Sequence, residues 1–214
     1  MQNMGVKNQK TPTTFFGFVD DLAEIADDVF IYPNVYIWGK CKIGSGTVIY
    51  PNTTIENSEI GENCVIKSSY IEDSVIKNNV SIGPFAHIRP HSVIENDCKI
   101  GNFVEIKASS LGQGTKASHL AYVGDADVGK KCNIGCGAIF VNYNGKSKNR
   151  TSVGDNCFVG SNCNIVAPVK IAKNSYICAG TTLTVDTECD DFVIGRCRET
   201  IKQNRAHNYL KEIL

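Results

Sequence analysis

Two cationic residues, Arg89 and Lys107, occupy equivalent places in a repeating pattern and could bind an anion together. Each directly follows an isoleucine, Ile88 or Ile106, and these isoleucines are 18 positions apart. If 18 residues make one coil of a stacked structure, the two cations lie on neighbouring strands about 4.8 Å apart. Unless a carboxylate such as Glu105 relieves their repulsion, such a pair suits a phosphate, to which both could form charge-assisted hydrogen bonds. The alternative is that Arg89 and Lys107 are ordinary surface charges in contact with water and bind no anion.

A second candidate site is a column of residues that each follow an aliphatic or small repeat position by two places. This column consists of His119, Cys136, Ser161 and Ala179. Small side chains in register could form a groove that admits a long, narrow ligand such as a pantetheine arm. His119 is a candidate functional residue because imidazole changes charge near neutral pH, although most lone histidines are structural.

One insertion interrupts the pattern after Phe140 and covers residues 141–150, with Asn-Gly as a turn signal. Loops on a rigid scaffold commonly carry function, and the three cations of this loop, Lys146, Lys148 and Arg150, could close over an anionic ligand. A solvated loop is the simpler explanation on the pattern alone.

The scaffold behind these candidates is defined by an aliphatic or small residue that returns about every six positions from Ile25 to Leu183. A glycine often follows it, and the fourth residue after it is usually small or β-branched. Period six fits neither a helix nor a long strand. Three turn-and-strand units instead predict one coil of about 18 residues around a triangular core, and about nine coils in all.

We therefore expect one all-β domain, a single-stranded parallel β-helix over residues 25–196. A lead-in segment over residues 1–24 precedes it, and residues 197–214 form a C-terminal arm or short helix that caps the solenoid or contacts a partner. Lysine plus arginine (22) balances aspartate plus glutamate (22), which argues against nucleic acid and anionic membrane as partners. Because no apolar stretch reaches the roughly 18 residues of a membrane span, we expect a cytoplasmic protein.

The ten cysteines are expected to be reduced thiols rather than a disulfide framework, since no secretion signal is evident. They form no Cys-x-x-Cys pair and no zinc-like cluster with histidine, so no metal site is predicted. Six of them fall on the fourth position after an aliphatic residue and should be small buried side chains. These are Cys41, Cys64, Cys98, Cys132, Cys157 and Cys163.

Four segments carry a specific resemblance: SIGPFAHIRPHSVI, KIGNFVEIKASSLGQGTKASHLAYVGDADVGKKCNIGCGAI, FVNYNGKSKNRTSVGDNCFVGSNCNIVAPV and ICAGTTLT. They closely resemble the acetyltransferase domain of the bacterial bifunctional glucosamine-1-phosphate N-acetyltransferase/N-acetylglucosamine-1-phosphate uridylyltransferase. That family belongs to the hexapeptide-repeat acyltransferases. The resemblance implies a left-handed β-helix, acetyl-CoA as cosubstrate, no metal in this domain, a homotrimer with active sites between solenoids, and a place in UDP-N-acetylglucosamine biosynthesis.

The resemblance also implies roles for individual residues. His119 would be the general base that takes a proton from the amine of glucosamine 1-phosphate as it attacks the acetyl thioester. Arg89, Lys107 and Tyr122 would hold the sugar phosphate, Asn133 the sugar, and Lys148 would be a phosphate contact from a neighbouring subunit. Acetyl-CoA would be bound by Cys136, Asn142, Tyr143, Ser161, Ala179 and Arg196.

Three features depart from the family pattern. Cys136 stands where a small alanine is common, and the tail from Cys197 to Thr200 differs from the usual ending, which bears on the contacts around Arg196. The nucleotidyltransferase half and its phosphate loop do not occur in the sequence, so uridylyltransferase activity is not expected.

Three other functions are kept as alternatives. The first is acetylation of another amino sugar phosphate, such as galactosamine 1-phosphate, with the same site. The second is a non-catalytic solenoid that binds a sugar nucleotide or a partner. The third is a metalloenzyme resembling the γ-class carbonic anhydrases, which could use His87, His91 and His119, although His87 and His91 do not share a column with His119.

Overall fold

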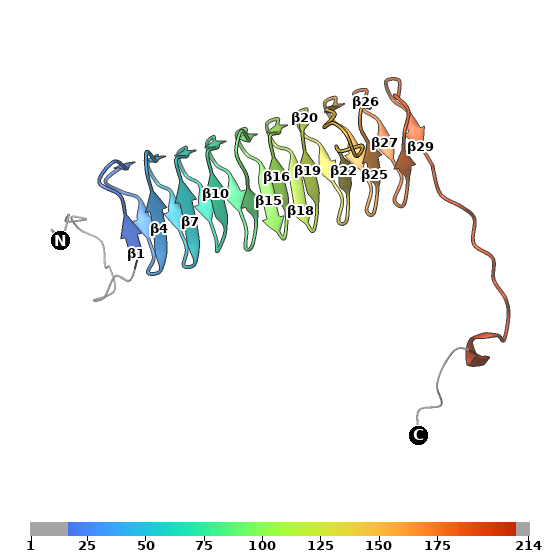
Figure 1. The fold of residues 1–214 in the computed structure, drawn as a ribbon, viewed down its shortest axis with the longest axis horizontal. Helices are drawn as coiled ribbons and strands as arrows, with labels where there is room; N and C mark the ends of the chain where they lie inside the picture. Colours follow the sequence, from blue (N-terminus) through green and yellow to red (C-terminus); the bar gives the residue numbers. More distant parts are fainter. Residues whose placement is uncertain (1–16, 209–214) are drawn as a thin grey trace.

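The computed structural model describes residues 17–208, and these form a parallel β-helix of about ten coils. Each complete coil contributes one short strand to each of three sheets, and the coils stack along one axis from β1 to β29 (Figure 1). The segment after β29 runs away from the end of the stack (Figure 1). It contains one turn of 3-10 helix, η1 (Ala206–Asn208).

The strands of each sheet are every third strand in the sequence, except that β29 is the second strand after β27. Sheet A contains β1 (Gly17–Val19), β4 (Val35–Trp38), β7 (Thr53–Glu56), β10 (Tyr70–Glu72), β13 (His87–Ile88), β16 (Glu105–Lys107), β19 (Tyr122–Gly124), β22 (Ile139–Val141), β25 (Asn164–Val166) and β28 (Thr182–Leu183). Sheet B contains β2 (Glu24–Ile25), β5 (Lys42–Ile43), β8 (Glu59–Ile60), β11 (Val75–Ile76), β14 (Val93–Ile94), β17 (Ser110–Leu111), β20 (Ala126–Val128), β23 (Thr151–Val153) and β26 (Lys170–Ile171). Sheet C contains β3 (Phe30–Ile31), β6 (Val48–Ile49), β9 (Val65–Ile66), β12 (Ser81–Ile82), β15 (Lys99–Asn102), β18 (Lys116–His119), β21 (Asn133–Ile134), β24 (Phe158–Val159), β27 (Tyr176–Ile177) and β29 (Phe192–Val193).

The interior is filled by the aliphatic residues of the repeat, which stack in register from coil to coil. In sheet A, Ile37 pairs with Ile55, Ile55 with Ile71, and Ile71 with Ile88. All four side chains are fully buried. Burying such a side chain contributes about 1.5–3 kcal/mol. Since each interior side chain packs against the coil before it and the coil after it, these two neighbours supply most of the stability of a coil.

Each corner between sheets C and A contains a residue in the left-handed backbone conformation. Most of these residues are types that tolerate it, namely Asn34, Asn52, Ser68, Gly137, Asn162 and Gly180. Three consecutive coils instead have Phe85, Phe103 and Leu120 there, with φ of 58°, 57° and 43°. These side chains are 59%, 54% and 55% exposed, and the two phenyl rings stack with centroids 5.4 Å apart. We call these three residues the corner ridge.

The structure confirms the predicted fold class and the buried place of the six repeat cysteines. It contains about one coil more than predicted, because β1 lies within residues 1–24, for which only a lead-in segment was expected, and β29 adds a strand after Leu183. Val19 of β1 lies six places before Ile25 and continues the period, whereas Val193 of β29 follows Leu183 by ten places and departs from it. No helix among residues 17–208 is both long and apolar enough to cross a membrane.

Candidate active site

The two cations singled out by their spacing do lie on neighbouring strands. Arg89 directly follows β13 and Lys107 ends β16, and these strands pair with Ile88 opposite Ile106. Each cation has a carboxylate beside it: Arg89 Nη1 donates a hydrogen bond to Glu105 at 2.8 Å, and Lys107 Nζ lies 3.4 Å from Asp125. The bond to Glu105 raises the pKa of the Arg89 guanidinium. These carboxylates hold the cations side by side despite their repulsion.

Asn142 connects Asp125, the ion-pair partner of Lys107, to Tyr122. Its side-chain nitrogen donates a short hydrogen bond to Asp125 and lies 3.3 Å from the Tyr122 hydroxyl. Asn142 is only 9% exposed, so this arrangement is fixed by burial as well as by bonding. The Tyr122 ring in turn lies over Gly124, whose absent Cβ would collide with the ring and the hydroxyl. Any larger residue at position 124 would push the tyrosine away.

Lys148 of the inserted loop lies beside Lys107 of the same chain. The proximity of Lys107, with a smaller contribution from Arg89, lowers the pKa of the Lys148 ammonium group. Three cations from β13, β16 and the loop after β22 therefore converge, with Asp125 and Glu105 as their counter-charges. An anion placed among them would relieve repulsion that the two carboxylates only partly offset.

Arg150 fastens the end of the inserted loop to the corner of the solenoid. Its guanidinium donates two hydrogen bonds to the carboxylate of Asp127 and one to the Ala108 carbonyl oxygen at 2.8 Å. These bonds lower the pKa of Asp127, to which Ser110 also donates. The loop that presents Lys148 is thus attached to sheet B through Arg150 at one end, and to Asp125 and Tyr122 through Asn142 at the other.

The small-residue column is present along the edge of sheet C. Strands β18, β21, β24 and β27 pair in register, so the residues two places after each interior position line up. His119, Cys136, Ser161 and Ala179 are all exposed. At the far end of this column, Arg196 Nη1 donates a hydrogen bond to the Ala179 carbonyl oxygen at 3.0 Å. The column forms an open track of small side chains with His119 at one end and Arg196 at the other.

His119 and Tyr122 lie on the two sides of one corner. His119 ends β18 on sheet C, and Tyr122 begins β19 on sheet A three residues later. The corner ridge residue Leu120 lies between them. The track and the cation cluster are therefore adjacent parts of one surface that wraps around the corner between sheets C and A.

Two other predicted residues lie on different elements: Tyr143 forms a backbone bridge with Lys148 in the inserted loop, and Asn133 lies on sheet C. Asn133 is on β21 of sheet C, in register with Lys116 and Phe158. Tyr143 is 57% exposed and its hydroxyl donates a hydrogen bond to the Gly145 carbonyl oxygen within the loop. Asn142, expected beside the coenzyme, donates hydrogen bonds within the chain to Asp125 and to Tyr122, of which Tyr122 is expected to hold the phosphate.

Three residues of this surface were not identified from the sequence as site residues: Asp125, Gly124 and Asn102. Asn102 lies one coil before His119 in the same column, and its Oδ1 is 2.8 Å from His119 Nδ1. Extending the column backward by one coil from His119 would have found it. Gly124 interrupts a position that is occupied by larger residues in the preceding coils, among them Glu72, Arg89 and Lys107.

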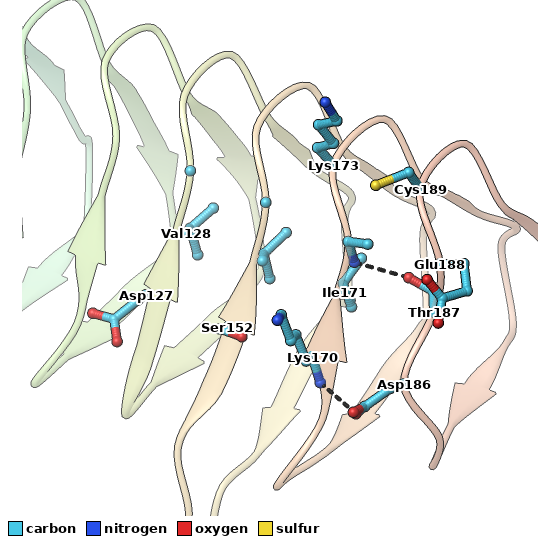
Figure 2. A pocket seen from close by; sticks show the side chains of 14 residues that line it. Asp127, Val128, Ser152, Lys170, Ile171, Lys173, Asp186, Thr187, Glu188 and Cys189 are labelled. Atoms are coloured by element: carbon cyan, nitrogen blue, oxygen red, sulfur yellow. Dashed lines mark hydrogen bonds between the residues drawn. The ribbon is translucent and has the colours of Figure 1, made fainter.

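A hollow of about 670 Å³ lies elsewhere, on sheet B near the end of the stack. The backbone nitrogens of Lys170 and Ala172 donate hydrogen bonds to the side chains of Asp186 and Thr187 on the next coil (Figure 2). The walls of the hollow are the outer surface of β20, β23 and β26 and the segment that follows β28. None of the predicted site residues lines it. Within residues 17–208, no group of three or more His, Cys, Asp or Glu side chains could hold a metal ion.

The fold and this surface define the class of protein: a left-handed β-helix of hexapeptide repeats with a cluster of three cations beside an open track. The family described as bacterial transferase hexapeptide (six repeats) matches residues 23–57, 73–108 and 150–184. The chain belongs to the hexapeptide-repeat acyltransferases, and the predicted resemblance to the acetyltransferase part of the bifunctional enzyme is confirmed by its relatives.

Among these relatives, the bifunctional protein GlmU of Thermoanaerobacter pseudethanolicus is 51% identical over 212 residues, which cover 99% of this chain and 46% of the relative. The GlmU protein of Caldicellulosiruptor saccharolyticus is 53% identical over 181 residues, which cover 85% of this chain and 39% of the relative. The chain thus spans about half the length of the curated relatives it matches. A solved structure of an Arabidopsis UDP-N-acetylglucosamine acyltransferase has the same fold, with a TM-score of 0.50, 20% identity, and coverage of 79% of this chain and 68% of that one.

Proposed function

We propose that this acyltransferase moves the acetyl group of acetyl-CoA onto the amine of glucosamine 1-phosphate. The observation that supports this most is the convergence of Arg89, Lys107 and Lys148 on one side of the corner that carries His119. A phosphate bound by the three cations would bring the attached sugar to that corner. The named relatives, bifunctional GlmU proteins, agree with this choice of reaction.

In this proposal the acetyl donor lies along the track of Cys136, Ser161 and Ala179, where small exposed side chains leave room for a narrow pantetheine arm. Cys136 serves as a wall of the track. Arg196, bonded to the Ala179 carbonyl oxygen, adds a cation at the far end of the track and would meet the phosphates of the coenzyme.

The chemistry is one acyl transfer without a covalent enzyme intermediate. The amine nitrogen attacks the thioester carbonyl carbon and forms the amide bond, while the carbon–sulfur bond breaks and the electron pair leaves with the thiol sulfur. The amine proton passes to His119, and the leaving thiolate takes up a proton. General base catalysis of this kind contributes typically about 10²–10⁴-fold, and fixing the phosphate lowers the entropic part of the barrier.

We further propose that the site is completed in a homotrimer. The corner ridge supports this, because its three exposed apolar side chains lie in left-handed positions that bulky residues occupy only at a cost of about 1–2 kcal/mol each. A second copy that covers the ridge would also close the open side of the track beside His119. Asn133, which is partly buried on sheet C, and Tyr143, which is exposed in the loop, would then contribute at the subunit boundary. A cytoplasmic location also remains a prediction.

The test is thiol release from acetyl-CoA by the purified protein, with glucosamine 1-phosphate, galactosamine 1-phosphate and free glucosamine as parallel acceptors. We expect the fastest release with glucosamine 1-phosphate. A His119→Gln variant should lose about 10²–10⁴-fold in kcat. The matched control is His91→Asn, which keeps a residue that tolerates the left-handed conformation at a corner of a neighbouring coil.

Each other outcome has a distinct meaning. A preference for galactosamine 1-phosphate would keep the reaction and change the substrate. Equal rates with free glucosamine would remove the phosphate cluster from recognition. No release from any acceptor would favour the non-catalytic solenoid, and full activity of His119→Gln would remove the proposed base.

A further inference from the structure

The structure assigns a second residue to the proposed base: we infer that Asn102 is a positioning residue that holds His119 with its proton on Nδ1 and its lone pair on Nε2. This inference rests on the proposed function, in which His119 takes the proton of the amine. It concerns the tautomer and the orientation of the ring, which can be measured whether or not the protein transfers acetyl groups.

The first observation is the hydrogen bond itself. Asn102 Oδ1 lies 2.8 Å from His119 Nδ1, which is within the usual range for a hydrogen bond between nitrogen and oxygen. An amide oxygen can only accept, so the Nδ1 in this bond carries the hydrogen. A neutral imidazole has one N–H, and Nε2 is then left with the free lone pair that a base requires. If the amide were turned over, its NH₂ would donate to Nδ1 and Nε2 would carry the hydrogen, which would disable that nitrogen as a base.

The second observation is that the two strands are lengthened at this point of sheet C. Strands β15 and β18 have four residues each, whereas every other described strand of this sheet has two. The extra length carries the parallel register past the interior positions to Asn102 opposite His119. Side chains in register on neighbouring parallel strands lie about 4.8 Å apart, which is the span that a short asparagine bridges.

The third observation is the close approach of the two backbones beside this pair. A Cβ on Gly101 would collide with the carbonyl oxygen of Ser118. The backbone nitrogen of Leu120 also donates a hydrogen bond to the Asn102 carbonyl oxygen at 3.0 Å. Glycine at 101 and this bond hold residues 102 and 119 at a fixed separation, so the hydrogen bond between their side chains forms without a further loss of backbone freedom.

The position of Asn102 is a proline in three of the four preceding coils, and proline offers no side-chain acceptor. These prolines are Pro33, Pro51 and Pro84, and the remaining coil has Ser68 two places after Ile66. In the column from Pro33 to Ala179, an amide side chain occurs only in the coil next to the histidine. On the other side of His119 the column continues with Cys136, so no carboxylate in the column competes for the ring.

The direct test is nitrogen NMR of the protein with ¹⁵N-labelled histidine at a pH where the imidazoles are neutral. The chain has four histidines, and the His119 resonances are identified by their loss in His119→Gln. We expect an Nδ1–H tautomer in the unsubstituted protein and a mixed or Nε2–H tautomer in Asn102→Ala. An Nε2–H tautomer in the unsubstituted protein, or no change in Asn102→Ala, would overturn the inference.

The kinetic test uses the same variants with acetyl-CoA and the best acceptor. Loss of the orienting partner should lower kcat by about 10- to 100-fold in Asn102→Ala, with little change in KM. In Asn102→Asp the carboxylate can still accept from Nδ1 and stabilises the protonated ring, so kcat should recover. The acid limb of the pH–rate profile should then move up by about one pH unit. A merely structural role would give neither recovery nor a shifted limb.

The control is Asn164→Ala on β25, which removes an equivalent bond, from the Asn164 amide nitrogen to Thr182 Oγ1 at 3.3 Å, far along the chain from His119. It should leave both the tautomer and kcat unchanged. The two proposals fail separately. An active His119→Gln variant removes the base while the tautomer result stands, whereas a normal tautomer and rate in Asn102→Ala removes Asn102 alone.

Discussion

The coils before Pro84 and the coils after it share one interior but differ on their outer surface. Interior isoleucines stack in register in both parts, and most are completely buried. Both parts also carry aromatic stacks outside, such as Phe18 on Trp38 with centroids 4.2 Å apart and Phe158 on Tyr176 with centroids 4.6 Å apart. The later coils carry the corner ridge, two lengthened strands of sheet C and an inserted loop. Stability is therefore spread along the whole stack, whereas the candidate site depends on departures from the repeat.

The prediction with the largest expected effect tests whether the stability of the fold is spread along the whole stack. Ile49→Ala on β6 and Ile134→Ala on β21 each remove a buried side chain, at an expected cost of about 2–5 kcal/mol. Urea unfolding should show similar losses for both. Acetyl transfer should fall only in Ile134→Ala, because Ile134 supports the strand that precedes Cys136.

The control for this pair is Ile201→Ala, since Ile201 is 84% exposed and should change the unfolding free energy by less than about 0.5 kcal/mol. Equal losses of activity in Ile49→Ala and Ile134→Ala would mean that the early coils are part of the site and would break the comparison.

The repeat made much of the molecule predictable. Because three units of six residues close one coil, the period alone placed Ile88 opposite Ile106 and therefore Arg89 beside Lys107. The same counting placed Cys136, Ser161 and Ala179 in line with His119. Asn102 obeys the same rule, one coil earlier, and was missed only because the column was counted forward from residue 117.

The remaining features do not follow from any period. The contact of Lys148 with Lys107 depends on how the loop over residues 141–150 folds back, and its bonds to Asp127 and Asp125 come from coils more than 15 residues earlier. Asn142 was assigned to the coenzyme by resemblance, while its bonds within one chain join it to Asp125 and Tyr122. Long-range side-chain contacts of a non-repeating loop leave no trace in the spacing of residues.

A second prediction concerns the left-handed corners, where the two parts differ by residue type. Phe103→Asn replaces a bulky residue at φ 57° by one that tolerates this conformation, and it removes one third of the corner ridge. If a second copy covers the ridge, light scattering should show a fall in mass from the proposed trimer toward the single chain. Asn52→Phe makes the opposite change at φ 62° in the early coils. It should cost about 1–2 kcal/mol of unfolding free energy and leave the mass unchanged.

Equal masses for Phe103→Asn and the unsubstituted protein would show that the ridge does not mediate assembly. The cost of placing bulky residues in the left-handed conformation at three consecutive corners would then not be offset by contacts with a second copy of the chain. A lower mass for Asn52→Phe would extend the interface to the early coils and weaken the distinction between the two parts.

The smallest expected effect concerns the attachment of the loop to the later coils. Hydrogen bonds from Arg150, and then from Ser110, lower the pKa of Asp127 in the folded protein. The pKa of an aspartate in an unfolded chain is about 3.9. The stabilisation from this contact is therefore fully present above that pH, and it is lost as the pH falls through the lower pKa of Asp127 in the folded protein. Both side chains are about half exposed, so the contribution at pH 7 should be only about 0.2–1 kcal/mol.

Urea unfolding of Asp127→Asn and of the unsubstituted protein should therefore differ at pH 7 and converge at acid pH, as Asp127 becomes protonated in the folded protein. The control is Asp21→Asn in the early coils, which should match the unsubstituted protein at both pH values. A constant difference between pH 7 and acid pH would mean that Asp127 stabilises the loop without its charge. No difference at pH 7 would mean that Asn142, at the other end of the loop, suffices to hold Lys148 beside Lys107.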